Sequence, residues 1–201
     1  MFNKEADFEN ALIALLATKS WEKEVLRYPT EEKLIANWQE HLNKTNQHID
    51  KLDVPLLRTE MNQILEQVQA LKTPYALNGF INGKTVAIKR ENEKSRHFGK
   101  EVSLDIFDRE EISAGKSRYQ IAQQPRFSPR SDLYPKQRGD LMLLINGMPM
   151  FHIELKRSGV PISQATYQIE RYHEAGAFSG IFSLVQVFVA MTPEECRYFA
   201  N

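Results

Sequence analysis

Residues 139–159 read GDLMLLINGMPMFHIELKRSG, and this stretch decides how the rest of the chain is interpreted. Two apolar runs flank Asn146-Gly147, a dipeptide that favours the tight turn of a β-hairpin. The runs nevertheless carry three charged residues, Asp140, Glu154 and Lys156. Burying a charge is expensive, so charges at the ends of a central hairpin need an explanation.

The two faces of the second strand differ in polarity. Because side chains alternate along a strand, Glu154 and Lys156 point to one face, and Phe151, Ile153 and Leu155 point to the other. We therefore expect a packed apolar face with a charged edge on its reverse side.

Two residues that lie directly opposite each other on paired strands point to the same face. Asp140 therefore lies on the same face as Glu154 only if the residue numbers of each opposite pair in the hairpin add up to an even number. This parity requires an odd-length loop or a β-bulge. A three-residue loop over residues 145–147, with Gly147 in the left-handed conformation, satisfies it. A tight two-residue turn at Asn146-Gly147 would put Asp140 on the opposite face.

Two acids and a lysine so placed suit divalent-metal hydrolysis of a phosphodiester. Asp140 and Glu154 supply the hard oxygen ligands that Mg²⁺ prefers. The metal polarises the phosphate and helps to generate hydroxide. The ammonium of Lys156 would position or deprotonate the attacking water, or stabilise charge that develops on phosphorus. The alternative is an ordinary hairpin with surface charges at its ends.

Composition limits the compartment and the partners. The chain has 201 residues, and its formal net charge of +0 argues against a general nucleic-acid binder. Cys196 is the only cysteine, which excludes an internal disulfide and favours a reducing, cytoplasmic location. We find neither a signal peptide nor an apolar run long enough for a membrane span, so no membrane partner is expected.

The chain changes texture after Thr73-Pro74. Apolar residues recur at helical spacing in residues 1–73, which predicts a helical N-terminal extension that packs on the rest. Residues 74–201 alternate β-branched runs with turn signals and contain one helical segment, residues 161–176. A mixed α/β body is therefore expected, with five strands, a helix and a last strand in that order.

Residues 138–156, followed by the helix at residues 164–176, resemble the N-terminal nuclease domain of the R (restriction) subunit of type I restriction–modification enzymes. The resemblance is detailed over residues 117–201 and weaker over the helical start. The residues that carry it are Arg138, Asp140, Asn146 to Pro149, Glu154 to Lys156, and Gln168 with Tyr172. One departure is Gly139, where the general motif has proline.

The resemblance implies an α/β fold of the PD-(D/E)xK restriction-endonuclease type, with a mixed sheet flanked by helices. It implies that Asp140, Glu154 and the Leu155 carbonyl bind Mg²⁺, with Mn²⁺ as an alternative. Lys156 would act on the water or the transition state. Gln168 and Tyr172, which share one helix face, would support cleavage beside the metal. Without the family, Tyr172 reads more simply as an aromatic residue that anchors the helix to the sheet.

The resemblance also implies partners outside the chain. It points to cleavage of unmodified foreign double-stranded DNA, with methyltransferase (M) and specificity (S) subunits of the same system as partners. ATP would enter only through a translocase motor that follows this domain in the family. The chain would therefore be a fragment of a longer protein. The rival hypothesis is a non-catalytic DNA-guiding or subunit-docking module that keeps the nuclease fold.

Several polar residues receive no role at this stage. His152 shares a strand face with Glu154, and His173 adjoins Tyr172, but neither is assigned to the site. Gln123 and Gln124 could touch a metal-bound water or DNA. The basic segment at residues 126–138 could hold DNA phosphates or be a solvated loop. Residues 114–118, AGKSR, imitate a phosphate-binding loop without its first glycine, so nucleotide binding is rejected.

Overall fold

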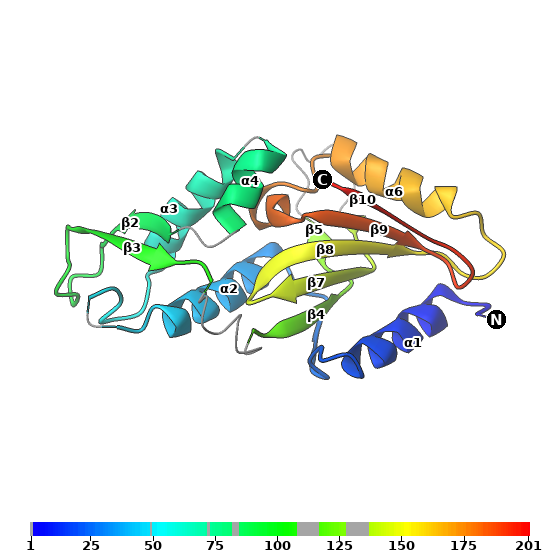
Figure 1. The fold of residues 1–201 in the computed structure, drawn as a ribbon, viewed down its shortest axis with the longest axis horizontal. Coiled ribbons are helices and arrows are strands. Elements are labelled where there is room, and N and C mark those ends of the chain that lie inside the picture. Colours follow the sequence, from blue (N-terminus) through cyan, green and yellow to red (C-terminus); the bar gives the residue numbers. More distant parts are fainter. Residues whose placement is uncertain (1, 49, 72, 82–84, 108–116, 128–136) are drawn as a thin grey trace. The chain divides into compact units, whose positions relative to one another are not determined.

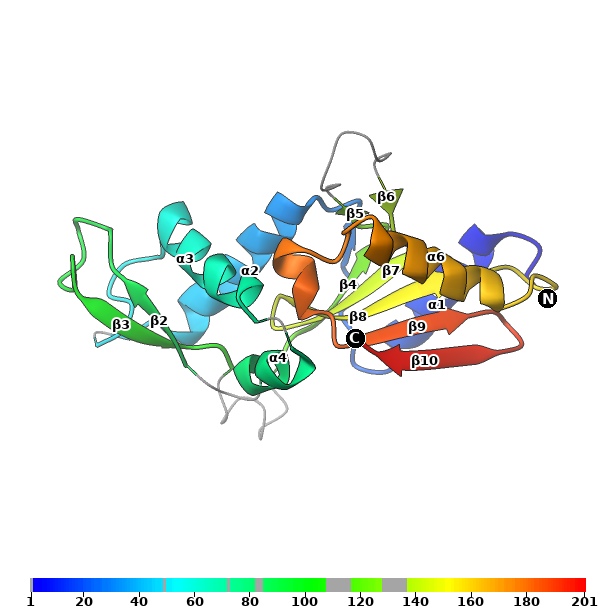
Figure 2. The ribbon, with the colours of Figure 1, turned by 90° about the horizontal axis from the view of Figure 1, so that it is seen from above.

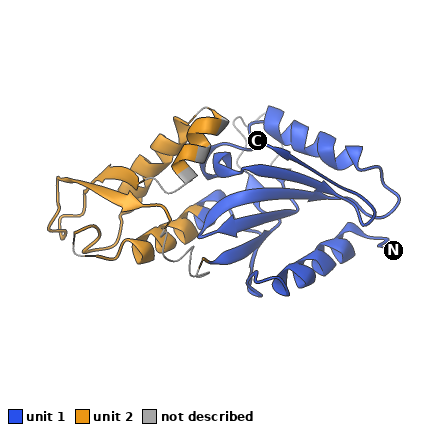
Figure 3. Cartoon of the chain, viewed as in Figure 1, with its two compact units in different colours: residues 1–34, 118–201 blue, residues 35–117 orange. Residues whose placement is uncertain are grey.

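The computed structural model describes most of the chain, namely residues 2–48, 50–71, 73–81, 85–107, 117–127 and 137–201. The chain folds into two compact units, which Figure 3 shows in different colours. We call residues 1–34 with 118–201 the sheet unit, and residues 35–117 the hairpin unit.

The sheet unit is built on a six-stranded mixed sheet with the strand order β1-β4-β7-β8-β9-β10. The strands are β1 (Val25–Arg27), β4 (Tyr119–Gln123), β7 (Leu141–Ile145), β8 (Met148–Leu155), β9 (Val187–Met191) and β10 (Cys196–Ala200). Strand β1 runs parallel to β4, and β8 runs parallel to β9, whereas the other neighbours are antiparallel. The predicted mixed sheet flanked by helices is confirmed.

Helices cover both faces of this sheet. Helix α1 (Glu5–Ala17) lies on one face, and helix α6 (Ser163–Glu174) lies on the other (Figures 1 and 2). The short 3-10 helix η1 (Gly180–Leu184) and a two-stranded ribbon, β5 (Arg126–Phe127) with β6 (Gln137–Arg138), complete the unit. Because both faces are covered, β7 and β8 are buried along almost their whole length.

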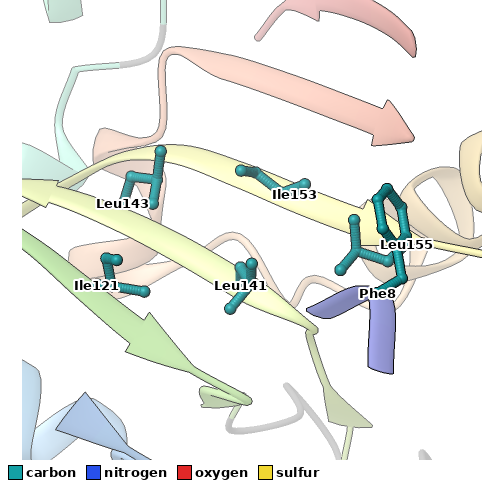
Figure 4. Close-up of a cluster of buried hydrophobic side chains, with 6 residues drawn as sticks. All are labelled: Phe8, Ile121, Leu141, Leu143, Ile153 and Leu155. Carbon is teal, nitrogen blue, oxygen red and sulfur yellow. The ribbon is translucent and has the colours of Figure 1, made fainter. Parts of the chain in front are cut away.

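Odd-numbered side chains of the central strands form the core beneath α1. Phe8 of α1 belongs to a cluster of buried apolar side chains, drawn in Figure 4, together with five residues of β4, β7 and β8: Ile121, Leu141, Leu143, Ile153 and Leu155. The even-numbered positions therefore face α6, and Glu154 is one of them. The alternation predicted for residues 151–155 is confirmed.

The hairpin turn differs from the three-residue loop that we expected. Ile145 pairs directly with Met148, so the loop is the two-residue turn Asn146-Gly147, with both φ angles positive at 50° and 83°. The register then shifts between Leu143 and Leu144, because Met150 is an extra residue on β8. This β-bulge restores even parity, and Leu141 pairs with Ile153. The expectation that a two-residue turn would turn Asp140 away was therefore wrong.

The hairpin unit packs helices against a two-stranded ribbon. Its elements are α2 (Glu31–Thr45), which begins in the sheet unit, α3 (Arg58–Gln69), α4 (Pro74–Ile81), β2 (Thr85–Lys89) and β3 (Glu101–Asp105). The apolar stripe of α3, which includes Met61, Ile64 and Val68, is fully buried. Gln63 and Gln67 of α3 bond to the backbone of β2, so these side chains satisfy polar groups along the strand.

This division differs from a boundary at residue 73. Helix α1 and strand β1 group with the sheet, whereas β2 and β3 group with the helices before them. The seven-element order expected for residues 74–201 omitted α4, the short strands β5 and β6, and the final strand β10. The expected helix at residues 161–176 is α6, and Gly176 ends it with a φ of 73°. Most of the basic segment, residues 128–136, and Ala114 to Lys116 lie outside the described residues.

A buried ion pair holds the hairpin unit together. Glu60 and Arg90 are both fully buried, with Arg90 Nη1 3.1 Å from Glu60 Oε2. The backbone N–H groups of Leu57 and Glu91 donate to the Glu60 carboxylate, and Arg90 Nη2 donates to the Val54 carbonyl. The pair therefore joins the start of α3 to the end of β2.

We predict that Glu60→Ala lowers the free energy of unfolding by about 3–5 kcal/mol, because it leaves a buried guanidinium without its counter-charge. Urea denaturation in a Trp21→Phe background would measure this through Trp38, the tryptophan of the hairpin unit. Lys51→Ala, which removes a partly exposed ion pair with Asp105, is the matched control and should cost at most about 1 kcal/mol. Equal losses in the two variants would contradict the prediction.

Candidate active site

The β-hairpin formed by β7 and β8, which belongs to the sheet unit, brings two carboxyl groups together at one end of the sheet. Asp140 precedes β7 by one residue, and Glu154 lies in β8. The backbone N–H of Leu155 donates to Asp140 Oδ2 at 2.7 Å, and the N–H of Asp140 approaches Glu154 Oε1 at 3.4 Å. The bulge at Met150 therefore produces the convergence that the sequence required of these two acids.

Burial changes the protonation of both acids. Removal from water, reinforced by the neighbouring Glu154, raises the pKa of Asp140 to about 8. Removal from water likewise raises the pKa of Glu154 to about 8, against the opposing charge of Lys156. Two like charges this close resist joint ionisation, so the pair retains a proton near neutral pH unless a cation compensates it.

Lys156 places its ammonium beside the two acids. Its Nζ donates to the Leu155 carbonyl at 2.8 Å and lies 3.7 Å from Glu5 Oε1 of α1. The charge of Lys156 lowers the pKa of both Asp140 and Glu154, although burial outweighs it. The triplet at residues 154–156 thus gathers a carboxyl group, a carbonyl and an ammonium at one place.

Gln168 and Tyr172 form a hydrogen-bonded pair on α6. Gln168 Nε2 donates to the Tyr172 hydroxyl at 2.6 Å, and this hydroxyl donates to the Arg138 carbonyl at 2.7 Å. Arg138 lies two residues before Asp140, so the pair holds the chain as it enters the site. Tyr172 is also buried, which agrees with its reading as an anchor of the helix to the sheet.

The glycine at the expected proline position has a steric reason. A Cβ atom at Gly139 would lie 2.5 Å from Cε1 of His152 and 3.2 Å from Cζ of Phe127. The N–H of Gly139 also donates to the Pro125 carbonyl at 3.1 Å, which proline could not do. The departure at residue 139 therefore follows from a close approach of β8.

His152 is wholly buried against the α6 side of the sheet. Its ring meets four aromatic rings edge-on, those of Phe127, Tyr172, Phe178 and Phe188. Burial lowers the pKa of His152 to about 4, so the imidazole is neutral at physiological pH.

Sequence reasoning missed two acids of α1. Glu9 is buried and accepts hydrogen bonds from Gln123 at 2.5 Å and from Gln124 at 3.2 Å. Glu5, one turn earlier, approaches Lys156. The available signal was the register of Glu9, which shares the helix face of Leu12 and Leu16, since an acid in an apolar stripe is unusual.

A glutamine pair links this acid to Asp140. Gln123 accepts a hydrogen bond from Arg27 Nη1 at 2.6 Å, and the N–H of Gln124 donates to the Asp140 carbonyl at 2.7 Å. Gln123 and Gln124, for which the sequence suggested contact with a metal-bound water or DNA, connect Glu9 to the backbone of the site. The other histidine left without a role, His173, lies next to Tyr172 on α6 and contacts the Phe178 ring.

The residues present fit a magnesium ion. Among the described residues, no group of three or more His, Cys, Asp or Glu side chains is placed to hold a metal. Magnesium needs fewer side chains, because it binds one or two carboxylates and keeps several waters. Oε2 of Glu154 is buried without a hydrogen-bond partner, and the adjoining carboxyl of Asp140 is short of compensating positive charge. A hard cation bound to both carboxyl groups would supply the missing partner and the missing positive charge.

These features define the structural class of the protein, which is a mixed α/β fold with two acids and a lysine at the end of a sheet covered by helices. The family model described as "Type I restriction enzyme R protein N terminus" matches residues 3–201. The chain therefore belongs to this family, and the recognition made from the sequence is confirmed.

Curated relatives agree with this assignment. The chain is 29% identical over 201 residues to "Type I restriction enzyme SauMSSORF170P endonuclease subunit" of Staphylococcus aureus strain MSSA476, covering 100% of this chain and 20% of that protein. A similar match, 29% over 202 residues with 100% of this chain and 20% of the relative covered, is "Type I restriction enzyme SsaAORF53P endonuclease subunit" of Staphylococcus saprophyticus.

A third relative is more similar over a shorter segment. "Type I restriction enzyme EcoprrI endonuclease subunit" of Escherichia coli is 42% identical over 66 residues, which are 32% of this chain and 21% of that protein. The chain thus spans about a fifth of the length of the curated relatives it matches. Within the described residues, no helix has the length and apolar character needed to cross a membrane.

We predict that the metal-free chain becomes less stable as the pH rises from about 4.5 to about 8. In this window the folded protein keeps protons on Asp140 and Glu154 that the unfolded chain, with ordinary pKa values of 3.8 and 4.5, releases. Urea unfolding at several pH values would measure the slope. The double variant Asp140→Asn/Glu154→Gln should have a flatter profile, and equal slopes would refute the prediction.

Proposed function

We propose that the chain is the Mg²⁺-dependent endonuclease domain of a type I restriction enzyme R subunit, which hydrolyses phosphodiester bonds of double-stranded DNA. The observation that carries the proposal is the convergence of Asp140 and Glu154 with Lys156 beside them. Membership of the family and the names of the relatives, which are endonuclease subunits, support the reaction class.

Asp140 and Glu154 would hold the cation, together with the Leu155 carbonyl. When bound, a divalent ion supplies a Lewis acid for the phosphate and lowers the pKa of a bound water. The raised pKa values of the acids mean that metal binding releases a proton, so affinity should increase with pH. Metal binding also removes the like-charge repulsion that burial imposes on the pair.

Lys156 would orient the attacking water or stabilise the negative charge that develops on phosphorus. Its ammonium already lies at the Leu155 carbonyl, which is one of the groups proposed to hold the metal. Partial burial strengthens its interaction with a phosphate, because fewer waters screen the charge. These properties suit the Lys156 ammonium to an interaction with the reacting phosphate.

Gln168 and Tyr172 would act mainly through the chain that carries Asp140. The Tyr172 hydroxyl is already bonded to the Arg138 carbonyl, and its second position is taken by Gln168. A direct contact with DNA phosphate would fall to the second amide hydrogen of Gln168. The pair thus couples α6 to the geometry of the metal site.

The rest of the reaction belongs to segments outside the chain. Because the relatives are about five times longer, we propose that ATP-driven translocation, sequence choice and the M and S subunits act through other parts of the assembly. The chemical step proposed for Asp140, Glu154 and Lys156 does not itself consume ATP.

We predict that Mg²⁺ or Mn²⁺ binds the wild-type chain and that Asp140→Ala/Glu154→Ala abolishes binding, because the variant removes both carboxylates. Isothermal titration calorimetry at pH 8 would measure the affinity. Glu195→Ala/Glu194→Ala, which removes two acids of the β9–β10 turn, is the control and should bind normally. Binding that survives the loss of Asp140 and Glu154 would overturn the proposed site.

We predict that Lys156→Met in the full-length subunit, assembled with its partners, lowers DNA cleavage by at least about 100-fold while ATP hydrolysis continues, because only the chemical step needs this ammonium. Linearisation of plasmid DNA and phosphate release from ATP would be followed together. Loss of both activities would instead indicate that Lys156 is needed for the fold or the assembly, as the rival docking module would require.

A further inference from the structure

His152 is a buried polar group that the proposed chemistry does not use. Its side chain is 0% exposed, and Nε2 lies 2.9 Å from Glu154 Oε1. Neither ring nitrogen has an aligned hydrogen bond to any described residue. The approach to Glu154 is therefore the one close polar contact that the structure records for this ring within the described residues.

Packing does not explain a histidine at this position. The four rings around it, from Phe127, Tyr172, Phe178 and Phe188, form an apolar environment. An apolar side chain would fill the space without leaving unpaired nitrogens, which destabilise a folded protein. A buried polar residue that lacks aligned hydrogen bonds and contacts Glu154 is therefore better explained by a role toward that carboxyl group than by packing.

The His152 ring also lies against the backbone just before Asp140. Its Cε1 would lie only 2.5 Å from a Cβ atom placed on residue 139, so His152 packs closely against Gly139. Gly139 directly precedes Asp140. One imidazole therefore contacts the carboxyl group of Glu154 and the backbone beside Asp140.

We propose that His152 is a positioning residue of the metal site: it fixes Glu154 through Oε1, leaves Oε2 for the cation, and sets the backbone next to Asp140. The inference rests on the proposed function, since it assumes that the two acids bind a metal. Groups that orient metal ligands commonly affect affinity by about 10- to 100-fold.

A matched pair of substitutions separates positioning from packing. Methionine and glutamine have similar length and flexibility, but only glutamine carries an amide that can meet Glu154. His152→Met should melt at the wild-type temperature or above it, because it removes unpaired nitrogens, and should bind Mn²⁺ at least about tenfold more weakly. His152→Gln should melt at a lower temperature yet keep Mn²⁺ affinity within about threefold of wild type.

The 201-residue chain would be titrated with Mn²⁺ by calorimetry and melted without metal. The inference is supported if His152→Met has the higher melting temperature and His152→Gln has the higher Mn²⁺ affinity. Affinity that follows melting temperature, affinity unchanged in both variants, or failure of His152→Met to fold would each overturn it. Phe178→Leu, which disturbs the same cluster away from Glu154, should lower the melting temperature and leave Mn²⁺ affinity unchanged.

The experiment distinguishes failure of the proposed metal site from failure of the positioning role of His152. If the wild-type chain binds no Mn²⁺ at Asp140 and Glu154, the proposed function falls, and the role of His152 falls with it. If the wild-type chain binds Mn²⁺ and His152→Met binds equally well, only the positioning role is overturned.

Discussion

Two carboxyl groups withdrawn from water at the same end of a sheet are the constraint on which this structure depends. Glu154 is fully buried and Asp140 partly so, and loss of hydration raises the pKa of each to about 8. The Leu155 N–H and the nearby Lys156 compensate them only in part. The covered sheet therefore leaves the two acids short of compensating positive charge, which is the property on which the proposed metal site rests.

The sequence predicted the strands and the helix of this site because their patterns are local. Apolar alternation and the Asn146-Gly147 turn mark the hairpin, and Gly176 marks the end of α6. The sequence also showed that an odd-length loop or a β-bulge was needed to bring Asp140 to the face of Glu154. It did not show that the structure would use a bulge. The bulge at Met150 depends on how β8 pairs with both β7 and β9, and no residue type at that position announces it.

Long-range pairing limited what could be predicted elsewhere. Strand β1 has only three residues and pairs with β4 about a hundred positions later, so no local pattern reveals it. The same distance hid the contribution of α1, whose Glu9 meets Gln123. The convergence of Asp140, Glu154 and Lys156 could be inferred because it arises within one hairpin. The acids of α1 could not, because they reach the site through the packing of a helix on a sheet.

The distribution of unpaired polar atoms points to the same place as the two acids. Among the described residues, five buried side-chain nitrogen or oxygen atoms lack a hydrogen-bond partner, and three of them belong to His152 and Glu154. The other two, Trp38 Nε1 and Arg90 Nε, lie in the hairpin unit, where Glu60 is bonded through both carboxylate oxygens. Glu154, unlike Glu60, keeps one carboxylate oxygen without a hydrogen-bond partner. This unmet hydrogen bonding supports the proposed metal site, because the rules of polar satisfaction are most often broken at functional sites.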